Sequence, residues 1–171
     1  NYPKFYLLAW SFNPEIKKTL TIGGAAYSFP KYGLAKYPEV NFDVVEIDPK
    51  VTDLATKYFR LKDNSRLAIY HEDGRTFLNR QEKKYDAIFI DAFSSSFSVP
   101  FQLTTIEAVN SIYEMLNENG VAMVNLISSI EGDKGKFFRA EYATYKKIFP
   151  QLYVFLVDDE SDYSEIQNII I

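Results

Sequence analysis

The chain alternates between short apolar runs and longer segments with recurring apolar side chains. A short, nearly continuous apolar run is typical of a strand that is buried on both faces of a sheet. Apolar residues spaced three or four apart predict an amphipathic helix. The predicted strands are Leu20–Ile22, Phe42–Ile47, Leu67–Tyr70, Tyr85–Ile90, Val121–Leu126, Leu152–Val157 and a further strand that begins at Asn168–Ile171.

Helical segments lie between these strands, and capping residues mark where several of them begin. Pro49 directly after Asp48 is a strong start signal, because Asp caps free N–H groups and Pro suits the first helical position. The predicted helices are Tyr2–Phe12, a helix capped by Ser28 that ends before Pro38, a helix after Asp48, a short helix at Arg75–Asn79, a helix from Thr104 or Thr105 to Leu116, and Lys136–Phe149. The helix after Asp48 has an apolar stripe made of Val51, Leu54, Ala55, Tyr58 and Phe59. In the helix that ends at Leu116, the inward residues are Ile106, Val109, Ile112, Tyr113 and Leu116, and Asn119-Gly120 forms a left-handed cap.

Strands that alternate with helices predict a mostly parallel sheet with right-handed crossovers, in a three-layer α/β arrangement. In such sheets ligands bind outside the carboxyl ends of the strands. Suggestive residues follow four of the predicted strands, and we expect them at one edge of the sheet. They are Gly23-Gly24, Glu46 with Asp48, Asp73 and Asp91.

Length and composition narrow the class of protein. With 171 residues, 47% of them hydrophobic, the chain predicts one folded domain over residues 1–171. It contains no cysteine, which excludes disulfides and thiolate metal sites, and we expect a cytoplasmic protein. The net charge of −4 gives no support for nucleic-acid binding, and no apolar run reaches the length of about 18 residues that spans a membrane.

Each candidate site residue also has a structural interpretation. Gly23-Gly24 could be an ordinary tight turn, although the preceding strand and the later acid favour a nucleotide site. The turn lacks the Gly-x-Gly-x-x-Gly pattern of dinucleotide sites. Asp48 is better explained as a helix cap than as a ligand, and Asp73 is equally suited to a cap and to an adenine contact. His71 is the single histidine, so neither a Ser-His-Asp triad nor a histidine metal site is expected.

Asp91 is the sharpest candidate, because a carboxylate at the end of a buried apolar strand needs a partner. It could anchor the following loop through the hydroxyls of Ser94–Ser96, or it could contact substrate. The pair Phe93 and Phe97 could flank a substrate or pack in the core. The acidic run Asp158–Asp162 could attract a cationic amine, although such runs are more often solvated loops.

The ordered set of motifs resembles the Rossmann-like S-adenosylmethionine methyltransferase fold and, within it, the spermidine/spermine synthase (polyamine aminopropyltransferase) family. The resemblance covers about residues 18 to 126. The segments that carry it are Ile22–Ala26, Val45–Pro49, His71–Arg75, Tyr85–Asp91 and Val99–Leu103.

The resemblance implies a site for S-adenosylmethionine or its decarboxylated form. By this likeness, Gly23 and Gly24 approach the methionine part and Glu46 holds the ribose hydroxyls. Asp73, with Gly74 beside it, accepts a hydrogen bond from the adenine amino group. A carboxylate suits both roles because it only accepts hydrogen bonds.

The resemblance also implies the reacting end of the site. Asp91 stands where the family places the catalytic acid that takes a proton from the attacking amine. Ser94 replaces the family's second acid, and with Tyr27 and Gln102 it is expected to contact the acceptor. Ala26 replaces an acid of the family's glycine motif, which leaves room for the carboxylate of S-adenosylmethionine.

The expected activity is aminopropyl transfer to a small-molecule amine or another nucleophilic acceptor. The alternatives are a small-molecule methyltransferase that uses S-adenosylmethionine and a non-catalytic nucleotide-binding module. No membrane partner is expected, and a homodimer is a further expectation. The family's N-terminal β-hairpin domain has no counterpart in residues 1–171, and because the chain starts at Asn1 rather than Met, an excised piece of a longer protein is expected.

Overall fold

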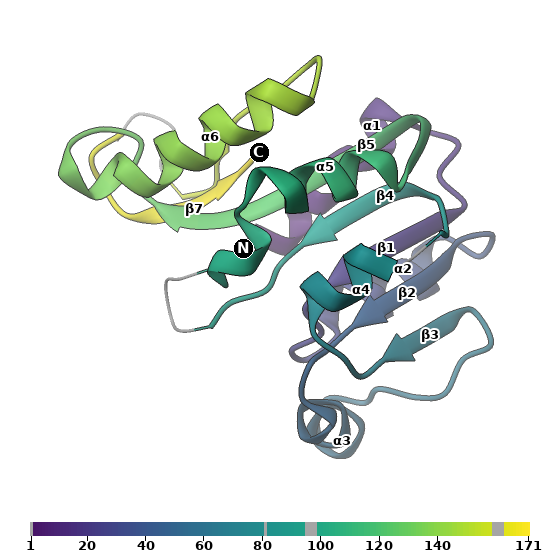
Figure 1. Cartoon of the computed structure of the whole chain (residues 1–171). Helices are drawn as coiled ribbons and strands as arrows, with labels where there is room; N and C mark the ends of the chain where they lie inside the picture. Colours follow the sequence, from purple (N-terminus) through teal and green to yellow (C-terminus); the bar gives the residue numbers. More distant parts are fainter. Residues whose placement is uncertain (1, 81, 95–98, 159–162) are drawn as a thin grey trace.

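The computed structural model describes residues 2–80, 82–94, 99–158 and 163–171. In this part of the chain, seven strands form one sheet in the order β3-β2-β1-β4-β5-β7-β6 (Figure 1). The strands are β1 (Lys18–Ile22), β2 (Asn41–Val45), β3 (Leu67–Tyr70), β4 (Tyr85–Ile90), β5 (Leu116–Ser128), β6 (Phe155–Leu156) and β7 (Gln167–Ile170). The first five run parallel, whereas β7 is antiparallel to both of its neighbours. The predicted, mostly parallel sheet is therefore confirmed.

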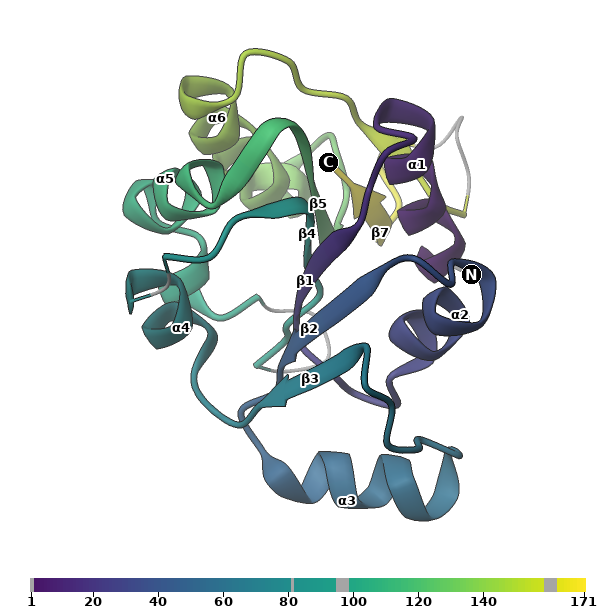
Figure 2. The same ribbon diagram turned by 90° about the vertical axis from the view of Figure 1, so that its right-hand side faces the viewer.

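Helices cover both faces of this sheet (Figure 2). Helices α4, α5 and α6 lie on one face, and α1 and α2 lie on the other, so the expected three-layer arrangement is confirmed. The helical elements are η1 (Tyr2–Leu8), α1 (Ala9–Phe12), α2 (Ser28–Lys36), α3 (Pro49–Tyr58), α4 (Gly74–Arg80), η2 (Phe101–Leu103), α5 (Ile106–Glu114), η3 (Asp133–Gly135) and α6 (Lys136–Ile148).

The central strand β4 is apolar from Ala87 to Ile90, where it is covered on both faces. Ile88 and Ile90 pack into the core beneath α4, α5 and α6. Ala87 and Phe89 point the other way and pack with residues of η1, α1 and α2. Because successive side chains of a strand point to opposite faces, a strand covered on both sides needs apolar residues at every position.

Helix α3 departs from its predicted packing. Its start is confirmed, since the Asp48 carboxylate accepts a hydrogen bond from the Lys50 N–H at 2.9 Å. Of the predicted apolar stripe only Ala55 is buried, while Leu54 and Tyr58 are 51% and 62% exposed. Figure 2 shows α3 beside the edge strand β3, and among its stripe residues Ala55 packs in a small cluster with Val44 of β2. The predicted inward stripe was therefore wrong, because position in the fold and not periodicity decides what a helix face meets.

Helix α2 begins after a different residue from the one predicted. Ser28 is its first residue and not its cap, and the preceding Tyr27 has left-handed backbone angles without a capping side-chain bond. The glycine turn before it sets this geometry, because Ala25 is also left-handed. The predicted Ser28 cap was wrong.

Helix α5 begins as predicted, with the Thr105 hydroxyl accepting a hydrogen bond from the Ala108 N–H. It ends at Glu114, before the predicted boundary. Asn119 is left-handed as predicted (φ 61°), but it lies within an irregular stretch of β5 rather than at the helix end. Ile106 and Tyr113, which were predicted to point inward, are exposed.

Candidate functional site

The carboxyl ends of the central parallel strands meet at one edge of the sheet. Gly23 N–H bonds the Val45 carbonyl at 2.8 Å, which aligns the end of β1 with the end of β2. Asp91 N–H bonds the Ile22 carbonyl at 2.9 Å and aligns β4 with β1 in the same way. Glu46 is aligned with β3 by a bond from its N–H to the Tyr70 carbonyl. The parallel pairing thus confirms that these strand ends share one edge.

The turn after β1 requires glycine at its first position. Gly23 has a φ of 102°, and a Cβ there would lie 2.3 Å from the Asp91 carbonyl oxygen. Both the backbone angle and the close approach exclude other residues without local rearrangement. Gly23 therefore brings the turn directly against the residue predicted to be catalytic.

Glu46 holds this turn together. Its carboxylate is 8% exposed and accepts hydrogen bonds from the N–H groups of Gly24 (2.9 Å) and Ala25 (3.2 Å) through Oε2. Its Oε1 accepts from the Asp48 N–H at 3.0 Å. One carboxylate therefore joins the turn after β1 to the start of α3, and three of its roughly four acceptor positions are in use.

Tyr27 lies in the core beneath the turn. Its ring is fully buried, and a Cβ on Gly24 would lie 2.7 Å from it. Its hydroxyl is 2.6 Å from the Thr52 hydroxyl, which is 2.9 Å from Nε2 of His71. The substrate contact expected for Tyr27 stays a prediction, and it would require the ring to leave this position.

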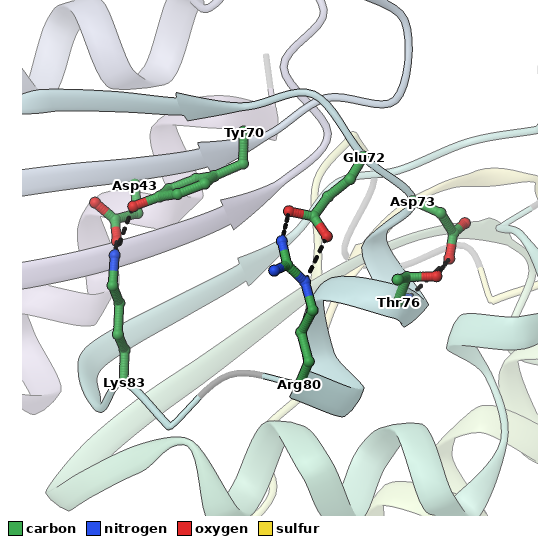
Figure 3. Close-up of polar contacts among 7 residues, drawn as sticks. All are labelled: Asp43, Tyr70, Glu72, Asp73, Thr76, Arg80 and Lys83. Atoms are coloured by element: carbon green, nitrogen blue, oxygen red, sulfur yellow. Dashed lines mark hydrogen bonds and ion pairs between the residues drawn. The ribbon is translucent and has the colours of Figure 1, made fainter.

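Asp73 directly precedes α4 and bonds Thr76 in its first turn (Figure 3). Its Oδ1 accepts hydrogen bonds from the N–H and the hydroxyl of Thr76, at 2.9 and 3.3 Å. Its Oδ2 has only a long contact with the Gln102 amide, at 3.4 Å. The helix-cap interpretation is confirmed, and one oxygen keeps the capacity to accept a further hydrogen bond. Gly74 follows, where a Cβ would lie 2.6 Å from Ile22.

Asp91 lies between η1 and β5. Its Oδ2 accepts a hydrogen bond from the Tyr2 hydroxyl at 3.1 Å, and its Oδ1 accepts from the Asn125 amide at 2.9 Å. Asn125 is 1% exposed and in turn accepts a bond from the Asn168 amide at 2.9 Å. Two elements that are distant in sequence, η1 and β5, thus orient the carboxylate directly, and β7 contributes through Asn125.

Burial dominates the electrostatics at Asp91. It raises the pKa of the carboxyl, and the hydrogen bonds from Asn125 and Tyr2, with the nearby Tyr6 hydroxyl, oppose the shift. Burial also raises the pKa of the Tyr6 hydroxyl, with a further contribution from the charge of Asp91. That hydroxyl has no hydrogen-bond partner of good geometry among the described residues.

The loop after Asp91 is described only in part. Phe93 is half-buried against the core, and Ser94 is exposed. Ser95, Ser96 and Phe97 lie outside the described residues, as do residues 159–162 of the acidic run. The roles expected for them stay predictions.

Sequence reasoning missed four residues at the site, namely Tyr2, Tyr6, Asn125 and Asn168. One signal could have found Asn125, because a polar side chain inside an otherwise apolar strand needs a buried partner. The rings of the two tyrosines lie edge to face, with centroids 6.0 Å apart, but nothing local relates this pair to Asp91.

Two features are absent from the part of the chain that the structure describes. No group of three or more His, Asp or Glu side chains there is placed to hold a metal ion. No helix in the same part of the chain has the length and apolar character that crossing a bilayer requires.

Comparison with known proteins gives one family. Residues 7–158 match the spermine/spermidine synthase domain. A polyamine aminopropyltransferase of Vibrio vulnificus (strain CMCP6) is 32% identical over 163 residues, covering 94% of this chain and 52% of the relative. The chain therefore spans about half the length of that relative.

Solved structures agree on the fold. Spermidine synthase from Thermotoga maritima aligns with a TM-score of 0.79 and 25% identity, covering 99% of this chain and 58% of that one. Human methyltransferase-like protein 13 in complex with SAH aligns with a TM-score of 0.78 and 23% sequence identity, covering 99% of this chain and 74% of that one. The Rossmann-like methyltransferase fold is thereby confirmed.

Proposed function

This chain belongs to the spermine/spermidine synthase family, and from that premise we propose that it transfers an aminopropyl group from decarboxylated S-adenosylmethionine to a small-molecule amine. The observation that carries the proposal is the shared strand edge, where the Gly23 turn, Glu46 and Asp91 meet. A nucleoside binds at such an edge in open parallel sheets. The half-buried Asp91 carboxylate beside it suits a proton acceptor.

The acceptor groups at this edge fit a nucleoside in different degrees. Asp73 fits an adenine amino group, because its Oδ2 has only the long contact with Gln102. Glu46 fits one ribose hydroxyl, since three of about four acceptor positions already serve backbone N–H groups. To accept both ribose hydroxyls it would release the N–H of Gly24 or Ala25. These residues are therefore the ones that we propose to hold the donor.

Asp91 carries the proton transfer in this proposal. In the reaction the amine nitrogen bonds to the carbon next to the sulfonium, and the C–S bond breaks with its electrons left on sulfur. The attacking nitrogen gives a proton to the Asp91 carboxylate, whose two oxygens each keep acceptor capacity beside Tyr2 and Asn125. The enzyme needs no covalent intermediate, because orientation and a base suffice.

One observation favours the methyltransferase alternative. Ala26 and its exposed neighbour Ala25 bring no negative charge to the turn. A donor that keeps its carboxylate would meet no acidic side chain from these two residues, so S-adenosylmethionine itself could bind, with Glu46 as the nearest acid of the turn.

Calorimetric titration separates these possibilities. We expect methylthioadenosine and decarboxylated S-adenosylmethionine to bind, with S-adenosylmethionine weaker. Preference for S-adenosylmethionine would favour methyl transfer, and no binding by any of the three would overturn the donor site.

A variant tests the role of Asp91. Asp91→Asn is expected to lower the transfer rate by about 10²–10⁴-fold while leaving nucleoside affinity unchanged, because it removes the proton acceptor only. Asp133→Asn, at a carboxylate that is 92% exposed on η3, is the matched control and should change neither. An unchanged transfer rate in Asp91→Asn would contradict the assignment.

Three broader expectations accompany this proposal. We propose that residues 1–171 act as one nucleotide-binding domain. The homodimer and the cytoplasmic location stay predictions.

A further inference from the structure

A line of side-chain amides connects Asp91 to the antiparallel end of the sheet. Asn125 lies inside β5, next to β4, and donates from Nδ2 to Asp91 Oδ1 at 2.9 Å. Asn168 lies in β7, on the other side of β5, and donates from Nδ2 to Asn125 Oδ1 at 2.9 Å. The proposed proton transfer assigns a role to Asp91 and none to these two asparagines.

The outer amide decides which way the inner amide faces. An asparagine side chain can rotate so that either its oxygen or its NH₂ group faces a neighbour. If the Asn125 oxygen faced the Asp91 carboxylate, two acceptors would meet in a nearly dry site, because Asn125 is 1% exposed. The bond from Asn168 occupies that oxygen and leaves the NH₂ group to face Asp91.

We propose that Asn125 is a positioning residue for Asp91 and that Asn168 holds it in the orientation that donates. This inference rests on the proposed function, in which Asp91 is the base. The amide fixes the direction of Oδ1 and keeps the carboxylate ionised, so that it can take a proton from the attacking amine. Asn168 acts only through Asn125.

The other groups that face Asp91 come from η1. They are the hydroxyls of Tyr2 and Tyr6, and no charged side chain among the described residues acts appreciably on Asp91. Burial raises the pKa of the carboxyl, and the donors from Asn125, Tyr2 and Tyr6 lower it. Loss of the Asn125 donor should therefore raise the pKa further.

The test is a carbon-detected NMR titration of the Asp91 carboxyl in the ligand-free protein. Asn125→Leu keeps the approximate volume and removes the donor, and we expect the Asp91 pKa to rise by about one to two units. Asn168→Ala should raise it by less, because Asn125 is then free to rotate. Because Asn168 is only half-buried, we expect Asn168→Ala to fold, and it still tests the proposal if Asn125→Leu does not fold.

Asn13→Ala is the matched control. Asn13 is also a buried asparagine (9% exposed), but its side chain bonds only the backbone of Asn119 and Glu15. It should lower stability without moving the Asp91 pKa. An Asp91 pKa equal to wild type in Asn125→Leu would overturn the inference, and an unchanged pKa in Asn168→Ala would overturn its outer link.

A second readout separates this inference from the proposed function. In active protein, the acidic limb of the pH–rate profile should move to higher pH in Asn125→Leu by the amount of the pKa shift, with donor affinity unchanged. A shifted pKa in a protein that transfers nothing would refute the proposed function and leave the orientation of Asp91 established. A shifted pKa with an unmoved acidic limb would refute the link to catalysis.

Discussion

At the scale of single residues, the site is built by backbone N–H groups and one carboxylate. Glu46 accepts three backbone hydrogen bonds and joins the turn after β1 to the start of α3. Gly23 allows that turn to lie against the Asp91 backbone. Both residues therefore shape the site before any ligand binds, and both should matter in the ligand-free protein.

Removing the Glu46 carboxylate should lower stability without ligand. Glu46→Ala leaves the N–H groups of Gly24, Ala25 and Asp48 without their hydrogen-bond acceptor. We therefore expect the free energy of unfolding to fall by about 2–4 kcal/mol. Urea denaturation of the ligand-free protein measures it. Glu114→Ala is the control, because that exposed carboxylate accepts a single side-chain bond from Asn110. Equal stabilities of the two variants would show that the turn does not depend on Glu46.

A methyl group at Gly23 should be more costly than one at Gly132. Gly23→Ala combines a φ of 102° with a Cβ 2.3 Å from a backbone oxygen, so we expect a loss above about 3 kcal/mol. Gly132 has a φ of 65° and a ψ of −166°, with nothing within 4 Å of its Cβ, so Gly132→Ala should cost about 1–3 kcal/mol from backbone strain alone. Thermal unfolding compares them, and similar losses would mean that backbone strain outweighs the close approach.

At the scale of elements, helices differ in what they bury. Helix α3 buries Ala55 alone and leaves most of its apolar stripe exposed. Helix α6 instead buries an acid, Glu141, which is 5% exposed and has no hydrogen bond or ion pair with any described residue. Burial raises the pKa of Glu141 to about 7. A neutral carboxylic acid is therefore the form that the folded helix prefers.

This preference gives α6 a pH-dependent contribution to stability. Because the pKa rises from 4.5 to about 7 on folding, the folded state binds more protons than the unfolded state between these values. Wild-type stability should thus fall as pH rises through this window, by an amount on the order of 1–2 kcal/mol from Glu141. In Glu141→Gln that contribution should vanish, as urea denaturation at pH 5 and about pH 8 would measure. A parallel pH dependence in both proteins would contradict the assignment.

At the scale of the whole molecule, the strands of the sheet are buried to different extents. The strands β1 and β4 are covered on both faces, with Leu20, Ile88 and Phe89 fully buried. At the β3 end every strand residue is only partly buried, and α3 lies beside this edge strand (Figure 2). Local opening should therefore begin at this end of the sheet, which also carries the proposed adenine side of the site.

Native-state hydrogen exchange should report this gradient. Amides of β1 and β4 are expected to exchange only on global unfolding, whereas those of α3 should have protection factors about two orders of magnitude lower. Methylthioadenosine, if it binds here, should protect α3 more than α6, because the start of α3 is bonded to Glu46. Uniform protection across α3, β1 and β4 would contradict the predicted order.

The sequence alone determined much of the fold and several parts of the site. Periodicity located the strands, and β3 and β4 have the predicted bounds. Capping chemistry located the starts of α3 and α5. Parallel strands bring their carboxyl ends to one edge, so order along the chain was enough to gather Gly23, Glu46 and Asp91. These features are local, or follow from topology, and need no knowledge of packing.

Only the tertiary structure decided what each side chain meets. Periodicity shows that α3 has an apolar stripe, but its place beside the edge strand β3 leaves most of that stripe exposed. The same limit applied at the site, where Glu46 proved to hold the glycine turn and Tyr27 proved to be buried. Asn125 bonds Asp91 across 34 residues, and Asn168 bonds Asn125 across 43. Such partners are set by strand order and packing, which short-range pattern does not contain.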